Sequence, residues 1–158
     1  MTEAIGLTAE MYRAVVTIVD ERVKDIRVTR EDFNALKGVV QELTQAQARA
    51  MLPGYLERHF GLVLEGKLSE KLSRQFFQID GQEVKINLYG EGKRDGQRVV
   101  VLGEAKSRIF RSDVEEFAES LALVEPVVKG EVMRVMFGYF LHPTAEEAAR
   151  ERDILLVA

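Results

Sequence analysis

The sequence predicts an α/β domain with a mixed central sheet flanked by helices, preceded by a helical N-terminal extension. Three observations support this prediction. Apolar residues recur every three or four positions through the first fifty residues, the period of an amphipathic helix. From Phe76 the period changes to two, and a continuous apolar run at 99–102 follows, as in a strand buried on both faces. Two helix-capping patterns then alternate with further apolar runs.

Composition narrows the class of protein. The 158 residues are 46% hydrophobic, which suits one globular domain with an appendage. No apolar run approaches the roughly 20 residues of a membrane span, no signal peptide is evident, and there is no cysteine, so we expect a cytoplasmic protein without disulfides. The net charge is −4, yet residues 58–111 carry an excess of four positive charges. That excess suits a phosphate-bearing substrate, although an unevenly charged solvated surface explains it equally well.

The N-terminal third predicts two amphipathic segments with narrow apolar stripes. The first stripe is Tyr12, Val16, Val19, Val23 and Ile26, and the second is Phe33, Leu36, Val40, Leu43, Gln47 and Ala50. Thr29 is a candidate N-cap between the two segments, which form either a helical hairpin or one long helix with a stutter.

We expect residues 1–53 to form a coiled-coil-like extension that ends at Pro53-Gly54, with a separate domain over residues 54–158. Narrow apolar stripes usually need a partner helix, so residues 8–50 predict a homo-oligomer. The alternative is that both segments pack on the domain of their own chain.

The later elements follow in order. A helix from Tyr55 precedes strands that end at turns at Asp80-Gly81 and at residues 90–96, and Ser112 and Glu115 form a capping box that starts a helix through about Val124. A strand at 132–141, a second capping box at 144–147, a helix to about Arg152 and a strand at 154–157 complete the chain.

The candidate chemistry lies at the end of the apolar run. Residues two apart on a strand project from one face, so Glu104 and Lys106 are predicted neighbours. A carboxylate can hold a divalent cation, and an ammonium beside it can orient the water that attacks a phosphodiester. An acidic and a basic residue at this spacing are also common on solvated surfaces. The position of Glu104 and Lys106 after a buried strand and before a capped helix is what favours a functional site.

The stretches 83–87, 99–108 and 113–117 resemble the catalytic core of the PD-(D/E)XK nuclease superfamily, and most closely its small, little-characterised members with a coiled-coil N-terminus. The resemblance covers residues 54–158 and implies a restriction-endonuclease-like fold. It also implies Mg²⁺ or Mn²⁺ as cofactor, with Glu104 as a metal ligand and Lys106 assisting the nucleophilic water. The family's first ligand, an Asp, falls on Asn87 here, which brings an oxygen but no charge.

Other acids could supplement Asn87. Glu83 shares its face by the two-residue period of a strand; Glu91 shares it too but lies beyond Gly90, and Glu57 is on the preceding helix.

Basic residues and histidines complete the candidates. Arg108 and Arg111 follow Lys106 and could contact the phosphates of DNA or RNA, or be surface charges. His59 and His142 lack the spacing of paired metal ligands, and we expect His142 to make a local hydrogen bond.

The leading hypothesis is therefore a metal-dependent nuclease domain, either active or degenerate at Asn87. The rival hypothesis is a non-catalytic oligomeric binding module that retains the nuclease fold.

Overall fold

The computed structural model describes residues 9–11, 13–15, 17–18 and 30–158. The chain divides into two compact units, residues 1–38 and residues 39–158. The described residues between 9 and 18 are helical. The first predicted stripe, Tyr12 to Ile26, and the Thr29 cap lie outside the described residues. Within the described part, no helix combines the length and the hydropathy that a membrane span requires.

A long helix, α2 (Arg30–Phe60), runs through the predicted break at Pro53-Gly54, so that prediction was wrong. Proline in a helix removes one hydrogen bond, but Leu52, Pro53 and Leu56 are all buried, and this burial offsets the loss. The helix ends at Gly61, whose φ of 67° is left-handed and whose N–H donates to the Glu57 carbonyl at 3.0 Å.

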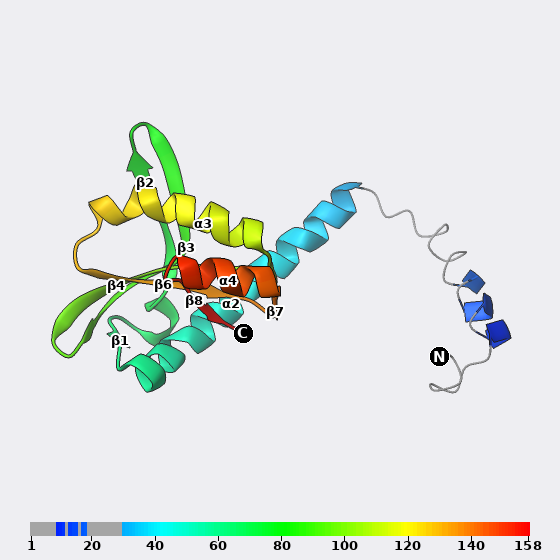
Figure 1. Cartoon of the computed structure of the whole chain (residues 1–158), viewed down its shortest axis with the longest axis horizontal. Coiled ribbons are helices and arrows are strands. Elements are labelled where there is room, and N and C mark those ends of the chain that lie inside the picture. The colour runs from blue at the N-terminus through cyan, green and yellow to red at the C-terminus, as the bar shows by residue number, and fades with distance from the viewer. Residues whose placement is uncertain (1–8, 12, 16, 19–29) are drawn as a thin grey trace. The chain divides into compact units, whose positions relative to one another are not determined.

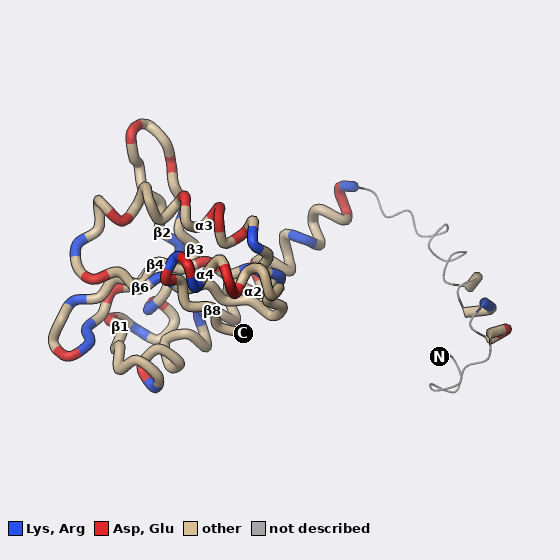
Figure 2. The backbone as a smooth tube through the Cα atoms, in the orientation of Figure 1, with Lys and Arg blue, Asp and Glu red and all other residues tan. Residues whose placement is uncertain are grey.

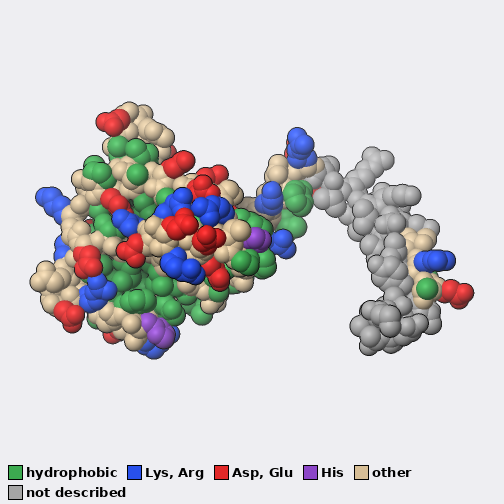
Figure 3. Space-filling model, in the orientation of Figure 1, with side chains coloured by type: hydrophobic (Ala, Val, Ile, Leu, Met, Phe, Trp, Pro, Cys, Tyr) green, Lys and Arg blue, Asp and Glu red, His purple; other side chains and the backbone are tan. Residues whose placement is uncertain are grey.

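The second half of α2 belongs to the sheet-bearing unit, which begins at Val39 rather than at residue 54. Ala48, Leu52 and Leu56 of this half belong to the core cluster that also contains Val99 and Val101 of the sheet. The second predicted stripe lies on another face of the helix: Phe33, Leu36, Val40 and Leu43 are 40 to 64% exposed. Hydrophobic side chains are visible on the exposed part of this helix in Figure 3.

The central sheet is mixed and has the strand order β1-β3-β4-β6-β8, with β2 paired to β3. Its strands are β1 (Val63–Leu64), β2 (Ser73–Ile79), β3 (Gln82–Arg94), β4 (Gln97–Ala105), β6 (Glu131–Phe137) and β8 (Leu155–Val157). The pairings through β3 are antiparallel, whereas β4, β6 and β8 run parallel. Two short strands, β5 (Arg108–Ile109) and β7 (Phe140–Leu141), form a separate pair.

Helices cover both faces of this sheet (Figure 1). Helices α3 (Arg111–Val124) and α4 (Pro143–Glu151) share one core cluster with Val100, Leu102 and Met136, while the second half of α2 shares the other with Val99 and Val101. Short 3-10 turns, η2 (Leu68–Glu70) and η3 (Glu125–Val127), complete the connections. The predicted fold class, a mixed α/β sheet with flanking helices and a long N-terminal helix, is confirmed.

Both hairpin turns use an Asp-Gly pair with positive φ, at Asp80-Gly81 (51° and 75°) and Asp95-Gly96 (51° and 76°), as the tight turns of twisted hairpins require. The predicted turn at 90–96 is shorter than expected, because β3 continues through Gly90 and Gly92. A Cβ on Gly92 would lie 2.3 Å from the Val63 carbonyl oxygen, so glycine there lets another backbone pass closely.

The two capping boxes are displaced from their predicted positions. The N-cap of helix α3 is Phe110 rather than Ser112, and the Phe110 N–H donates to the Asp113 carboxylate rather than the Ser112 N–H to Glu115. Helix α4 is capped by His142, whose Nδ1 accepts the Thr144 N–H at 3.2 Å, so the expected local hydrogen bond of His142 is confirmed.

Candidate functional site

Glu104 and Lys106 stand at the end of the most buried strand. The run Val99 to Leu102 of β4 is fully buried, and Glu104 follows on the face of Val100 and Leu102, which is the face covered by α3. Lys106 lies just beyond the strand, where its N–H donates to the Phe137 carbonyl at 2.9 Å and extends the parallel pairing by one step. The structure thus brings Glu104 and Lys106 to one face, as the two-residue spacing predicted.

Lys106 is held by Asp113, a residue that the sequence analysis did not select. The Lys106 Nζ donates to Asp113 Oδ1 at 3.0 Å, while Asp113 Oδ2 accepts the Phe110 N–H at 2.8 Å. One carboxylate therefore caps α3 and anchors the ammonium at the tip of β4. The sequence signal was present, because Asp113 lies three residues after Phe110, but Ser112 was the more typical cap residue.

Three carboxylates and two ammonium groups interact around the strand end. Burial raises the pKa of Glu104; the Lys106 and Lys85 ammonium groups oppose this, and the Asp113 and Glu116 carboxylates add to it. Burial disfavours the charged form of Lys106, but the hydrogen bond and charge of Asp113, with Glu104 and Glu116, outweigh it and raise the pKa of Lys106. Figure 2 shows the acidic residues along α3 that contribute to this field. A bound cation would relieve the crowding of negative charge around Glu104.

Asn87 and Glu104 each lie one residue beyond the last pair of the antiparallel β3–β4 ladder, which is Leu88 with Gly103. Asn87 is only 4% exposed, and its Oδ1 is buried without a hydrogen-bond donor. Since buried polar atoms are nearly always paired, this open oxygen near the end of the ladder suits a ligand that the protein atoms do not supply.

A β-bulge separates Asn87 from Glu83. Ser73 pairs with Tyr89 but Gln75 pairs with Ile86, so β3 holds one extra residue at this point. The alternation of side chains is interrupted there, and the parity argument that put Glu83 on the face of Asn87 does not hold.

The supplementary acids are not brought to Glu104. Glu83 is exposed and accepts a 3.4 Å hydrogen bond from Gln78, and Glu57 is exposed on α2, which covers the opposite face of the sheet. Glu91 accepts the Tyr89 hydroxyl at 2.6 Å and pairs with Arg98 at 2.6 Å. Among the described residues, no three His, Cys, Asp or Glu side chains converge in a way that could hold a metal ion.

The two predicted phosphate-binding arginines differ in their surroundings. Arg111 is paired with Glu115 at 3.2 Å and with Glu151 at 3.4 Å. Arg108 begins β5 and is exposed. The His59 ring contacts the Tyr55 ring, with centroids 4.4 Å apart and planes tilted by 41°, on α2, which covers the face of the sheet away from Glu104.

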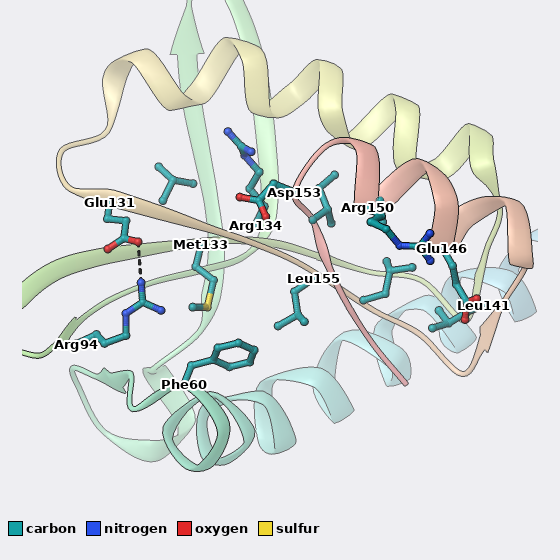
Figure 4. Close-up of a pocket in the computed structure, with 14 residues that line it drawn as sticks. Phe60, Arg94, Glu131, Met133, Arg134, Leu141, Glu146, Arg150, Asp153 and Leu155 are labelled. Atoms are coloured by element: carbon teal, nitrogen blue, oxygen red, sulfur yellow. Dashed lines mark hydrogen bonds and ion pairs between the residues drawn. The ribbon is translucent and has the colours of Figure 1, made fainter.

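A cavity of about 610 Å³ lies elsewhere, beside β6 and α4 (Figure 4). Phe60, Met133 and Leu155 are among its apolar lining residues, and its charged lining residues are Arg94, Glu131, Arg134, Glu146, Arg150 and Asp153. In the space-filling view the charged side chains over α4 border a group of hydrophobic ones (Figure 3). Glu104, Lys106 and Asn87 do not line this cavity, so it is separate from the predicted site.

No protein-family model matches the chain, and no curated protein matches it. Two solved structures are similar to it. One is the crystal structure of a protein of unknown function, AF1548, with a TM-score of 0.48 and 18% identity, over 72% of this chain and 56% of that one. The other is a repair endonuclease from Pyrococcus abyssi, with a TM-score of 0.35 and 17% identity, over 68% of this chain and 44% of that one. The chain thus spans about half the length of each of these proteins.

Proposed function

We propose that Glu104 and Asn87 bind a divalent cation, Mg²⁺ or Mn²⁺, and that the chain hydrolyses phosphodiester bonds of DNA or RNA. The observation that carries the proposal is the buried, unpaired Asn87 Oδ1 on the strand next to that of Glu104, each one residue beyond the last β3–β4 pair. Mg²⁺ in proteins is held by one or two carboxylates, with waters and substrate phosphate completing its shell; Glu104 supplies one carboxylate, and Asn87 would add a neutral oxygen. When bound, the cation would lower the pKa of a coordinated water and neutralise charge on the phosphate.

The chain's own residues would then orient the substrate and the water. Lys106, fixed by Asp113 at 3.0 Å, presents an ammonium beside Glu104 that stays protonated at neutral pH, because its pKa is raised. A protonated ammonium can donate hydrogen bonds to the attacking water or to a phosphate oxygen. Arg108, exposed two residues later, is placed to contact a neighbouring phosphate.

The second candidate function is a non-catalytic oligomeric binding module. Asn87 brings no negative charge, the described acids form no three-ligand group, and Lys106 is already neutralised by Asp113. The exposed apolar residues of α2 suit self-association through a helix. These observations favour the module over the enzyme if the strand end binds no cation.

Calorimetric titration with Mg²⁺ and Mn²⁺ tests the proposal. We expect wild type to bind the cation and Glu104→Gln to bind it at least tenfold more weakly. Glu83→Gln changes an exposed acid on β3, the strand that carries Asn87, and should bind as wild type does. Asn87→Asp restores the missing charge and should tighten binding at least tenfold. Absence of binding by wild type at millimolar metal would reject the enzyme and leave the module.

Cleavage assays follow from the same variants. Labelled single- and double-stranded DNA and RNA are incubated with each protein in Mg²⁺ or Mn²⁺. We expect Lys106→Met to lose cleavage while keeping metal binding, because the ammonium acts on water or substrate rather than on the ion.

A further inference from the structure

Two arginines converge on one buried glutamine on the α2 side of the sheet. The Gln45 Oε1 accepts from Arg49 Nη2 at 3.2 Å and from Arg74 Nη2 at 3.1 Å. Gln45 and Arg49 belong to α2, and Arg74 belongs to β2. Gln45 is 2% exposed, so packing fixes its amide and the amide fixes both guanidinium groups. Two like charges are thus held side by side by a neutral group.

The negative charge at this point does not balance the positive charge. Glu42 pairs with Arg74 at 3.1 Å, but its side chain is 65% exposed, so water screens that pair. Arg49 bonds only neutral acceptors, Gln45 and the Asn87 carbonyl at 3.3 Å, and its buried Nε has no acceptor. Among the described residues no carboxylate pairs with Arg49. A partly buried cation without an anionic partner is costly, and an incoming anion would relieve that cost.

A cavity of about 370 Å³ opens at these arginines, lined by Glu42, Arg49, Ser69, Leu72, Ser73 and Arg74. Ser69 comes from η2 and Ser73 from the start of β2, so the donors reach the cavity from three elements. The two hydroxyl groups can donate as well as the two guanidinium groups.

We propose that this cavity binds a phosphate group. Phosphate offers several acceptor oxygens in a tetrahedral arrangement, which matches donors that approach from three elements, whereas a carboxylate offers two oxygens in a plane. The phosphate can belong to free phosphate or a nucleotide, or to a nucleic-acid backbone. The site lies on the other side of the sheet from Glu104, which faces α3, although the Arg49 hydrogen bond to the Asn87 carbonyl connects the two regions.

Titration of the metal-free full chain with inorganic phosphate, at constant ionic strength, tests the site. Arg74→Gln should weaken binding about tenfold, the value of one charge-assisted hydrogen bond, and Ser73→Ala a few-fold. Arg94→Gln is the matched control, because Arg94 also forms one surface ion pair, with Glu131 at 2.7 Å, but lies outside the cavity. Arg49 is left unchanged because Gln45 and the Asn87 carbonyl depend on its donors.

Three results would overturn the proposal: no phosphate binding by wild type at tens of millimolar, an equal loss in Arg94→Gln and Arg74→Gln, or acetate binding as tightly as phosphate. The source of the phosphate is read from competition with DNA and RNA oligonucleotides in EDTA. An oligonucleotide that displaces phosphate, and is itself weakened by Arg74→Gln, identifies the backbone as the source. Phosphate binding without such displacement identifies a free phosphate or nucleotide. Glu104→Gln should leave phosphate binding unchanged. A chain that binds phosphate but no cation would therefore contradict only the proposed function, and a chain that binds the cation but no phosphate would contradict only the phosphate site.

Discussion

The Nζ of Lys106 lies 3.0 Å from Oδ1 of Asp113, and the other oxygen of the same carboxylate accepts the N–H that begins helix α3. The tip of the central strand and the start of the next helix are therefore tied through one side chain. A substitution that removes both oxygens of Asp113 therefore changes the helix cap and the position of the ammonium together.

Asp113→Asn separates these two roles. The amide oxygen can still accept the Phe110 N–H, but the charge facing Lys106 is lost, so we expect the free energy of unfolding to fall by about 1 kcal/mol. Asp113→Ala also removes the cap and should cost about 2 kcal/mol. Urea denaturation measures both. Glu115→Gln, which removes an exposed pair with Arg111 on the same helix, should cost less than about 0.5 kcal/mol, and an equal cost there would contradict this role for Asp113.

Glu104→Gln should make the protein more stable at neutral pH. The pKa of Glu104 is raised above its ordinary 4.5, chiefly by burial, so the folded state holds this proton more tightly than the unfolded state. The free energy of unfolding of wild type then falls as the pH rises from 4.5 through the raised pKa of Glu104, because the buried carboxyl loses its proton. Glutamine cannot ionise, so the variant should not show this loss of stability. The advantage of the variant should vanish at low pH. Denaturation curves of both proteins across pH measure it, and a wild type more stable than the variant at pH 7 would be the contrary result.

Tyr89 should titrate far above its free value. Burial, with the hydrogen bond and charge of Glu91, raises the pKa of Tyr89 from 10.0 to about 12. Glu91→Gln removes the charge but not the burial, so we expect the pKa to move back only part of the way. Tyrosinate absorbance against pH reports the titration, with Tyr89→Phe to identify the signal. A transition at the ordinary value in the folded wild type would show that Glu91 does not accept this hydroxyl.

Gly92→Ala should destabilise the protein by about 3 kcal/mol. The new methyl group would lie 2.3 Å from the Val63 carbonyl oxygen and 2.9 Å from the Leu64 Cα, so β1 would have to move away from β3. Gly38→Ala is the matched control, because nothing lies within 4 Å of the added carbon and alanine favours a helix by about 1 kcal/mol. Thermal unfolding compares the two variants, and similar changes in both would rule out the close approach.

Leu43→Glu tests self-association. Leu43 is an exposed member of the apolar stripe on α2, and a carboxylate there would prevent a second copy from covering it. We expect wild type to sediment as an oligomer and the variant as a monomer. Leu123→Glu, the same change at an exposed site on α3, should keep the oligomer. A wild type that stays monomeric at high concentration would remove the basis for an oligomeric module.

Local signals in the sequence were enough for the fold class, the order of the main strands and helices after residue 76, the Asp80-Gly81 turn and the placement of Glu104 near Lys106. Each of these depends on a period or a turn within a few residues, and short-range sterics decide such features. The same reasoning failed at Pro53-Gly54, where buried apolar contacts carry α2 through a residue that is unfavourable locally.

Only the tertiary structure decided which residues surround the strand end. The bulge in β3 separates Asn87 from Glu83, Asp113 reaches Lys106 from a helix, and Glu57 lies on the opposite face of the sheet. Gln45 likewise binds Arg49, four residues away, and Arg74, 29 residues away in the sequence. A strand period fixes which side chains share a face of one strand, but it carries no information on which other element covers that face, because packing between distant segments sets that choice.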